Sequence, residues 1–250
     1  FCVVWLRQEK NADVVTAVSR ELERKIDVIV GRKLGVERIP NAVDLSIFAP
    51  GPLPEGAREA RGIATGEVVL GFCGELRHKK GLPFLLGALA RVRRERPACL
   101  LVIGEVRPRE LGQLQAFAAE EPEAARRILV TGRIDESAEV AACHRLCDLY
   151  LQPSVWEGLP NALLEAMACE RVVLASDAGA IAEVVRQGED GFTLPKAQLH
   201  RLGSAILEIL ARPVAERLVI GRAARARVAE HYAPANEEAA LRRVLGRLRG

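Results

Sequence analysis

Large aromatic side chains and methionine are scarce in this chain of 250 residues. Phe, Trp and Tyr together make up 4% of the sequence, and there is a single Met. No apolar run reaches the ~18 residues that a membrane-spanning helix needs. Neither sign of charge dominates, since the formal net charge is +3. A nucleic-acid-binding domain usually carries a clustered basic face, so this balance does not favour a nucleic-acid partner.

Metal-ligand patterns are also missing. Cys143 and Cys147 are four residues apart in an expected helix, but no second pair and no nearby set of histidines completes four ligands. We therefore expect the six cysteines to be core thiols, no metal site, and a reducing, cytoplasmic compartment. The chain opens with Phe1 rather than Met, and we expect it to be a piece of a longer polypeptide.

Several enzyme signatures are absent as well. There is no G-x-G-x-x-G after a strand, no G-x4-G-K-[ST] loop and no G-x-S-x-G elbow. An Asp-x-Asp pair that would hold a divalent ion beside a diphosphate is missing too. These absences argue against dinucleotide-binding, P-loop and serine-hydrolase chemistry.

What the chain does contain is an alternation of short apolar runs and longer amphipathic segments. Continuous runs rich in Val, Ile and Leu suit strands buried on both faces of a parallel sheet, and the alternation predicts an α/β, doubly wound parallel sheet. In such a sheet, ligands bind beyond the carboxyl ends of the strands. We expect strands in 13–19, 36–43, 67–74, 98–105, 126–132, 147–154 and 171–177, and helices in 20–33, 81–96, 109–127, 136–146, 159–170 and 236–250.

One linker divides the chain. The segment from Asn41 to Gly66 holds three prolines and several glycines. Only one strand–helix–strand unit precedes it, which is too little to fold alone. We therefore divide the chain into residues 1–50, a linker at 51–66, a main domain at 67–235 and a C-terminal helix at 236–250.

The stretch PSVWEGLPNALLEAMAC (153–169) carries the first candidate site. Pro160 suits the first position of a helix, where its missing N–H is harmless. The next amides would then lack intrahelical partners and could bind a phosphate. These are the N–H groups of Asn161, Ala162 and Leu163.

Two acids flank this helix start. Glu165 is four residues after Asn161 on the same helix face, and helical side chains lean towards the N-terminus. Glu157 precedes the helix on the other side of the opening. A phosphate on the amides and a polyol between two acceptors describe a nucleotide sugar. The spacing of two acids is weak evidence for a binding site on its own. The alternative is that Glu157 is solvated and that Glu165 caps the helix or pairs locally.

The second candidate site is the stretch from Gly71 to Ala90, where a strand is expected to end at Gly74. Cations crowd the start of the following helix, which is unfavourable for the helix dipole unless an anion binds there. We expect Arg77, Lys80 and the helix amides to neutralise a diphosphate without a metal ion. An exposed basic loop is the alternative.

These linked motifs resemble the donor-binding half of GT-B fold glycosyltransferases, in particular the retaining family four, also called group one. The resemblance covers nearly the whole chain. Residues 12–19 and 39–50 resemble the close of the partner N-terminal domain and its hinge, and 172–195 resemble a further family stretch. The family pattern PS-x-x-E-G-x6-E-A-M-A matches Pro153, Ser154, Glu157, Gly158, Glu165, Ala166, Met167 and Ala168.

The resemblance implies a role for each site residue. Glu157 would lie against the transferred sugar as the catalytic residue, Glu165 would hold the ribose hydroxyls, and Lys80 would grip the diphosphate. It implies a UDP, GDP or ADP sugar, no cofactor, transfer with retention of configuration, and an acceptor-binding N-terminal domain that this chain lacks, so that the chain alone is inactive. The remaining donor-binding residues would be Gly74 and Arg77, then Arg133 and Ile134 in the loop that reads the base, and finally Gly158, Leu159, Pro160, Asn161 and Ala162.

This sequence departs from the family pattern at several positions. Glu75 stands where the family has a phosphate-binding arginine, for which Arg77 is a replacement by hypothesis. Glu170 stands where a left-handed glycine is preferred at a helix end, at a cost of ~1 kcal/mol. Ala180 replaces a glycine, and Ala42 replaces another in the hinge.

Two other functions remain open at this point. One is a nucleotide-sugar epimerase, which would need Glu157 to take a proton from a sugar carbon. The other is a non-catalytic sugar-nucleotide binding module. For the parent protein, peripheral attachment at the inner face of the membrane is an alternative to a purely cytoplasmic location.

Overall fold

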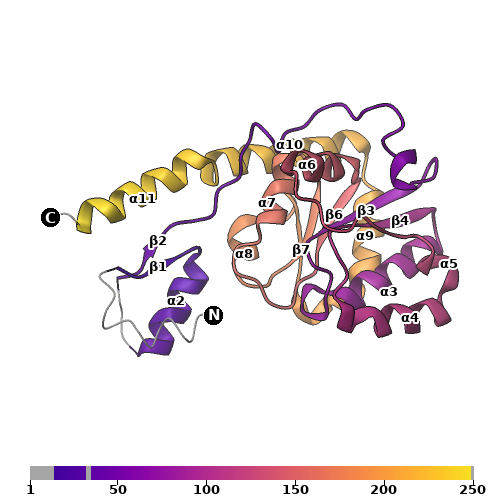
Figure 1. Cartoon of the computed structure of the whole chain (residues 1–250), viewed down its shortest axis with the longest axis horizontal. Helices are drawn as coiled ribbons and strands as arrows, with labels where there is room; N and C mark the ends of the chain where they lie inside the picture. The colour runs from indigo at the N-terminus through magenta and orange to yellow at the C-terminus, as the bar shows by residue number, and fades with distance from the viewer. Residues whose placement is uncertain (1–13, 32–34, 249–250) are drawn as a thin grey trace.

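The computed structural model describes residues 14–31 and 35–248. Its centre is a six-stranded parallel sheet with the strand order β5-β4-β3-β6-β7-β8, shown in Figure 1. The predicted α/β, doubly wound parallel sheet is therefore confirmed. The order reverses direction between β3 and β6, which makes this pair the topological switch point. The strands are β3 Val68–Cys73, β4 Ala98–Ile103, β5 Ile128–Val130, β6 Leu149–Gln152, β7 Val173–Ser176 and β8 Phe192–Leu194.

Both faces of the sheet are covered, because strand side chains alternate between two apolar layers. On β3, Leu70 and Phe72 pack with helices α3 and α9, whereas Val69 packs on the opposite face with α6. Helix α7 packs against β6, β7 and α10. The helices are α3 Leu82–Arg93, α4 Leu111–Glu120, α5 Pro122–Ala125, α6 Ser137–Leu146, α7 Asn161–Ala168, α8 Ile181–Val184, α9 Leu202–Leu210, α10 Val214–His231 and α11 Pro234–Leu248, with 3-10 helices η2 Glu59–Arg61, η3 His78–Lys80, η4 Pro108–Glu110 and η5 Lys196–Arg201.

A small strand–helix–strand unit precedes the linker. It consists of β1 (Thr16–Ala17), α2 (Arg20–Val30) and β2 (Glu37–Arg38), with β1 and β2 parallel. The Ser19 side chain accepts a hydrogen bond from Leu22 N and caps α2. The unit lies at one end of the molecule beside α11 and away from the six-stranded sheet (Figure 1).

Each of the seven expected strands contains an observed strand, although the first two are reduced to Thr16–Ala17 and Glu37–Arg38. Strand β8 and helices α8, α9 and α10 were not assigned from the sequence. The expected C-terminal helix begins at Pro234, two residues before the predicted start. Residues 1–12 and Asp13, at the start of the first expected strand, lie outside the described residues, as does Cys2.

The expected linker at 51–66 is not a free tether. It contains the turn of η2, and Ile63 is buried against the layer that holds Cys99 and Cys143. Within the described ranges, no helix combines the length and apolar character that crossing a membrane requires.

The cysteines in the described part of the chain are free thiols. Cys99, Cys143, Cys147 and Cys169 are buried, and the Cys147 thiol donates to the Cys143 carbonyl oxygen at 3.3 Å. These four positions confirm the expected core role. Burial raises the pKa of the Cys99 thiol to about 12, so it stays protonated.

The end of α7 carries the backbone strain expected at Glu170. Its φ is +59°, the one positive value at a non-glycine residue in the described ranges. Its N–H donates to the Met167 carbonyl, which closes the helix end. A left-handed conformation crowds the Cβ of an L-residue, and glycine avoids that crowding.

We predict that Glu170→Gly raises the free energy of unfolding by roughly 0.5–1 kcal/mol, because relief of the strain outweighs the added freedom of the unfolded chain. Chemical denaturation measures it. Glu170→Ala is the control, since it removes the carboxylate and keeps the Cβ. Equal stability of the glycine and alanine variants would contradict this account.

Candidate functional site

The candidate site lies at the carboxyl ends of β3, β6 and β7, at the switch point of the sheet. Three loops meet there, at residues 74–81, 153–160 and 177–180. Backbone hydrogen bonds join them: Val155 N donates to Lys79 O at 2.9 Å, and Ala180 N donates to Gly158 O at 3.1 Å. The loops that carry the two predicted constellations are therefore built into one surface.

Two glycines allow this close approach. Gly81 has φ +90°, and a Cβ there would lie 2.2 Å from the Pro153 carbonyl oxygen. Gly179 has φ +60°, and a Cβ there would lie 2.0 Å from the Glu157 carbonyl oxygen. The neighbouring Ala180 has φ −72°, which any L-residue adopts. The family's glycine is thus dispensable at 180.

Glu157 is the centre of the site. Its side chain is only 9% exposed, and a buried carboxylate needs partners. Three donors meet on its Oε1 atom: the Lys80 ammonium, the Ser154 hydroxyl at 2.8 Å and the Gln152 amide at 3.0 Å. No donor to Oε2 is found among the described residues, so one oxygen is fixed and the other is left to accept a hydrogen bond.

A further set of buried contacts holds these partners in place. The Tyr150 hydroxyl donates to Gln152 Oε1 at 2.8 Å, which orients the amide towards Glu157. The Ser176 hydroxyl donates to the Ser154 carbonyl at 2.6 Å and ties the end of β7 to the loop after β6. Burial raises the pKa of Tyr150, so the phenol remains a donor.

The start of α7 differs in one detail from the sequence expectation. Pro160 is the N-cap, with φ −78° and ψ 111°, and the helix begins at Asn161 rather than at the proline. The carbonyl of an N-cap residue accepts the first helical bond, and Leu163 N accordingly donates to Pro160 O at 3.2 Å. The expectation of a free Leu163 amide was wrong. Asn161 and Ala162 keep N–H groups with no acceptor in the described chain.

Glu165 lies one turn further along α7, with its side chain 20% exposed. Its Oε2 is 3.5 Å from Nε2 of His144, a fully buried residue of α6. The thiol of Cys73, at the end of β3, faces the same place. Burial raises the pKa of Cys73 to about 12, and the nearby Glu165 carboxylate adds to the shift.

The positive charge of the loop at residues 74–81 is partly balanced by an acid in the same loop. Arg77 lies 3.2 Å from Glu75, and Arg107 contacts the other oxygen of Glu75 at 3.3 Å. The acid at 75 therefore holds two arginines at the edge of the site. At the predicted base loop, Arg133 is exposed and pairs with Asp135 at 2.7 Å, while Ile134 packs on the layer behind the sheet. Gly74 follows β3 directly and has φ +122°.

Gln152, Ser154 and His144 were not among the predicted site residues, although Ser154 belongs to the quoted family pattern. Gln152 and Ser154 flank Pro153 at the end of a predicted strand, and polar residues at a strand's carboxyl end could have marked them. His144 offered no such signal, because a single histidine on a helix face is common in protein cores.

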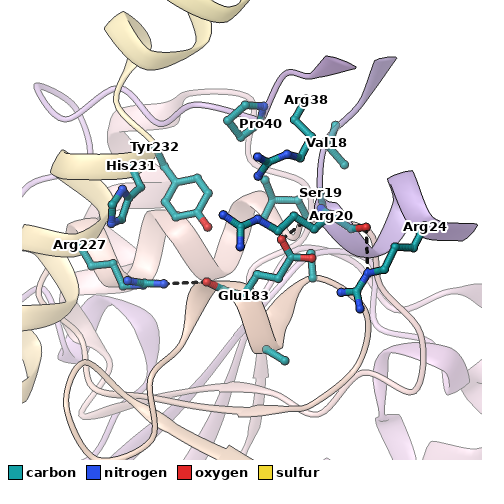
Figure 2. Close-up of a pocket in the computed structure, with 13 residues that line it drawn as sticks. Val18, Ser19, Arg20, Arg24, Arg38, Pro40, Glu183, Arg227, His231 and Tyr232 are labelled. Atoms are coloured by element: carbon teal, nitrogen blue, oxygen red, sulfur yellow. Dashed lines mark hydrogen bonds between the residues drawn. The ribbon is translucent and has the colours of Figure 1, made fainter. Parts of the chain in front are cut away.

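A separate cavity of about 530 Å³ lies at the junction of the N-terminal unit with the main domain. Figure 2 shows its lining, in which Arg20, Arg24, Arg38 and Arg227 surround Glu183. The Glu183 carboxylate accepts hydrogen bonds from Arg20 N at 3.1 Å and Glu21 N at 2.8 Å, so it caps α2. The lining includes Leu159 and Ala180 from two of the site loops but not Lys80, Glu157 or Glu165. The buried polar network around the Glu157 carboxylate therefore lies outside this cavity.

Comparison with protein families decides the identity of this domain. Residues 67–212 match the family described as Glycosyl transferases group 1. The chain belongs to this family. The resemblance noted in the sequence is thereby confirmed, and the six-stranded domain is the C-terminal domain of a GT-B glycosyltransferase.

Curated relatives are similar along most of the chain. The lipopolysaccharide core biosynthesis mannosyltransferase LpcC of Rhizobium leguminosarum bv. viciae is 30% identical over 246 residues, which cover 94% of this chain and 68% of that protein. The GDP-mannose-dependent alpha-(1-6)-phosphatidylinositol monomannoside mannosyltransferase of Mycolicibacterium smegmatis is 31% identical over 81% of this chain and 54% of that protein. The chain spans about half the length of most of the curated relatives it matches.

Solved structures share the fold. Sucrose-phosphate synthase from Thermosynechococcus elongatus superposes with a TM-score of 0.85 at 25% identity, covering 98% of this chain and 61% of that one. Anabaena HepE, solved in complex with UDP-glucose, has a TM-score of 0.85 at 20% identity over 98% of this chain and 68% of that one.

We predict that Gly179→Ala lowers the free energy of unfolding by at least about 2 kcal/mol, because the new Cβ collides with the backbone of Glu157 and the residue keeps a positive φ. Chemical denaturation measures the loss. Gly188→Ala is the matched control: its φ is +77°, but a Cβ there has no atom within 4 Å. We expect a loss of about 1 kcal/mol for the control. Equal losses in both variants would remove the close-approach argument.

Proposed function

We propose that this chain binds a nucleoside-diphosphate sugar, and that in the full-length protein the sugar is transferred to an acceptor with retention of configuration. The observation that carries this proposal is the hydrogen bonding of the Glu157 carboxylate. One carboxylate oxygen is held by Lys80, Ser154 and Gln152, and no donor reaches the other among the described residues. A carboxylate oriented in this way, beside a helix start, suits a sugar hydroxyl.

The diphosphate is proposed to lie between Lys80 and the first turn of α7. An ammonium group has three donors, so Lys80 can keep its bond to Glu157 and still donate to a phosphate oxygen. The free amides of Asn161 and Ala162 add a second set of donors at the positive end of the helix. These groups supply the positive charge that the leaving group needs, and the proposal requires no metal ion or other cofactor for transfer.

The nucleoside is proposed to extend past Glu165, whose carboxylate would accept from the ribose hydroxyls. The base would then reach the loop of Arg133 and Ile134. Anabaena HepE was solved with UDP-glucose, and the Mycolicibacterium relative is named as GDP-mannose-dependent. These names support a UDP or GDP sugar, with ADP as the remaining candidate.

Glu157 is proposed to orient and stabilise the transferred sugar rather than to act as a base. Three hydrogen-bond donors, from Lys80, Ser154 and Gln152, already occupy one carboxylate oxygen and fix the orientation of the group. That arrangement disfavours the epimerase alternative, which needs a proton acceptor. The family's transfer chemistry favours an enzyme over a non-catalytic binding module.

The acceptor is proposed to be bound by a domain that precedes the hinge, so this chain by itself would bind donor without useful transfer. The relatives' names place several of them in envelope polysaccharide or glycolipid synthesis. Such acceptors fit an enzyme that works in the cytoplasm, at the inner face of the membrane.

Donor binding is tested on the chain as it stands, by titrating UDP, GDP and ADP in the presence of a chelator. We expect one of the three to raise the melting temperature and to bind with a measurable Kd by calorimetry, because a ligand of the native state stabilises it. No shift with any of them would overturn the proposal, and binding that needed added magnesium or manganese would overturn its metal-independent part.

We predict that Lys80→Ala and Glu165→Ala each weaken binding of that nucleotide by about 1–3 kcal/mol, since each removes a charged hydrogen-bonding partner. Calorimetry on the folded variants measures the change. Lys25→Ala and Glu238→Ala are matched controls, because both residues form surface ion pairs on other helices, α2 and α11. Unchanged affinity in both site variants would exclude these assignments.

A further inference from the structure

His144 is an unusual buried residue. Its side chain is fully buried, and neither ring nitrogen has a hydrogen-bond partner among the described residues. Buried polar atoms are nearly always hydrogen-bonded, because leaving one unpaired costs free energy. The imidazole is also held in place by aromatic neighbours, with ring centroids 5.4 Å from Tyr150 and 6.2 Å from Phe48. A fixed ring with free nitrogens suggests a ligand.

Two other metal-binding groups face the same point. Cys73 ends β3 and Glu165 lies on α7, and one ligand atom from each of the three residues falls within 4.8 Å of the others. The separation between His144 Nε2 and Glu165 Oε2 is 3.5 Å, which is too long for a good hydrogen bond. Metal–ligand bonds of about 2.0–2.3 Å in a tetrahedral zinc site place neighbouring ligand atoms about 3.3–3.7 Å apart. That pair already has the required spacing, and the thiol, which lies within 4.8 Å of both, needs to approach by at most about an ångström.

We propose that Cys73, His144 and Glu165 form a binding site for a thiophilic divalent cation of the zinc class. Thiolate and imidazole ligands select zinc over magnesium or calcium, which prefer sets of oxygen atoms. The thiolate and the carboxylate together balance the two positive charges of the ion, which favours binding in a largely buried place. Three protein ligands leave the fourth tetrahedral position open to water.

A metal ion can reach this site from solvent, and the proton that its binding releases can be accounted for. Glu165 is 20% exposed and Cys73 is half-buried, so the site opens on the surface at the end of β3. On binding, the Cys73 S–H bond breaks, a sulfur–metal bond forms, and the proton leaves to solvent. Neutral His144 donates the lone pair of Nε2 and loses no proton. Neither step involves an oxidant or a reductant.

Occupation of this site would control the donor site, an inference that rests on the proposed function. Glu165 is the residue proposed to hold the ribose hydroxyls, and a carboxylate bound to the cation cannot receive them in the same way. We therefore infer that zinc and the nucleotide compete, and that the cation acts as an inhibitor. It does not take part in neutralising the diphosphate, which lies towards Lys80.

The first test measures metal binding without any nucleotide. The chelator-treated chain is titrated with Co²⁺ and followed by absorption, and Zn²⁺ is then added to displace it. We expect one cobalt ion per chain to give a thiolate-to-cobalt charge-transfer band and the visible bands of a tetrahedral site, and zinc to remove both. Absence of these bands would overturn the proposal.

Variants locate the site. Cys73→Ser should abolish the charge-transfer band, and His144→Gln should weaken metal affinity at least about tenfold. Cys143→Ser and His231→Gln are the matched controls, one a buried thiol of α6 and the other a partly exposed histidine of α10, and both should bind cobalt as the parent chain does. Circular dichroism and melting curves identify any variant that fails to fold. A band retained in folded Cys73→Ser, or lost equally in Cys143→Ser, would overturn the assignment.

The second test separates this inference from the proposed function. The nucleotide that raises the melting temperature is titrated calorimetrically with and without saturating Zn²⁺, and the apparent Kd should rise with zinc in the parent chain and much less in Cys73→Ser. If cobalt binds but no nucleotide does, the metal site stands and the proposed function fails. If the nucleotide binds equally well with bound zinc, the inhibitory role is excluded. If His144→Gln changes nucleotide affinity in chelator while cobalt binding is unchanged, His144 is a positioning residue for Glu165, and the metal proposal is overturned.

Discussion

The interaction on which the site depends is the set of donors around the Glu157 carboxylate. A charge that is 9% exposed persists only if its surroundings compensate for the lost hydration. Lys80 supplies the charge, and Ser154 and Gln152 supply the neutral hydrogen bonds. Lys80 belongs to the loop after β3, whereas Gln152 ends β6 and Ser154 follows it. This one carboxylate therefore also joins two segments that the sheet brings together.

The parallel sheet was readable from the sequence because its signal is local. Buried strands such as Val68–Cys73 are continuous apolar runs, and the segments between them have helical spacing. Lys80, Glu157 and Glu165 were singled out for a similar reason, since each belongs to a short linked motif. Strand β8 (Phe192–Leu194) was not assigned, because Thr193 interrupts its apolar residues and leaves no continuous apolar run.

Contacts between distant segments could not be read in this way. The loop at 177–180 packs against Glu157 only because Gly179 lacks a Cβ. Nothing in the sequence distinguishes this glycine from one that merely allows a turn. The grouping of Cys73, His144 and Glu165 joins three elements that are far apart in the chain. Spacing rules for metal ligands test local pairs such as Cys143 and Cys147, and they miss ligands assembled by the fold. The proline at 160 was misplaced by one residue because N-cap and first-turn positions both tolerate proline.

The cap that Glu183 places on α2 has a mechanical consequence. This carboxylate belongs to α8, which follows directly from the turn at Gly179, and that turn rests on the backbone of Glu157. Only the few residues from Gly179 to Glu183 therefore separate the cap of α2 from the backbone of Glu157. The N-terminal unit is thereby anchored to the same short segment that supports the Glu157 backbone.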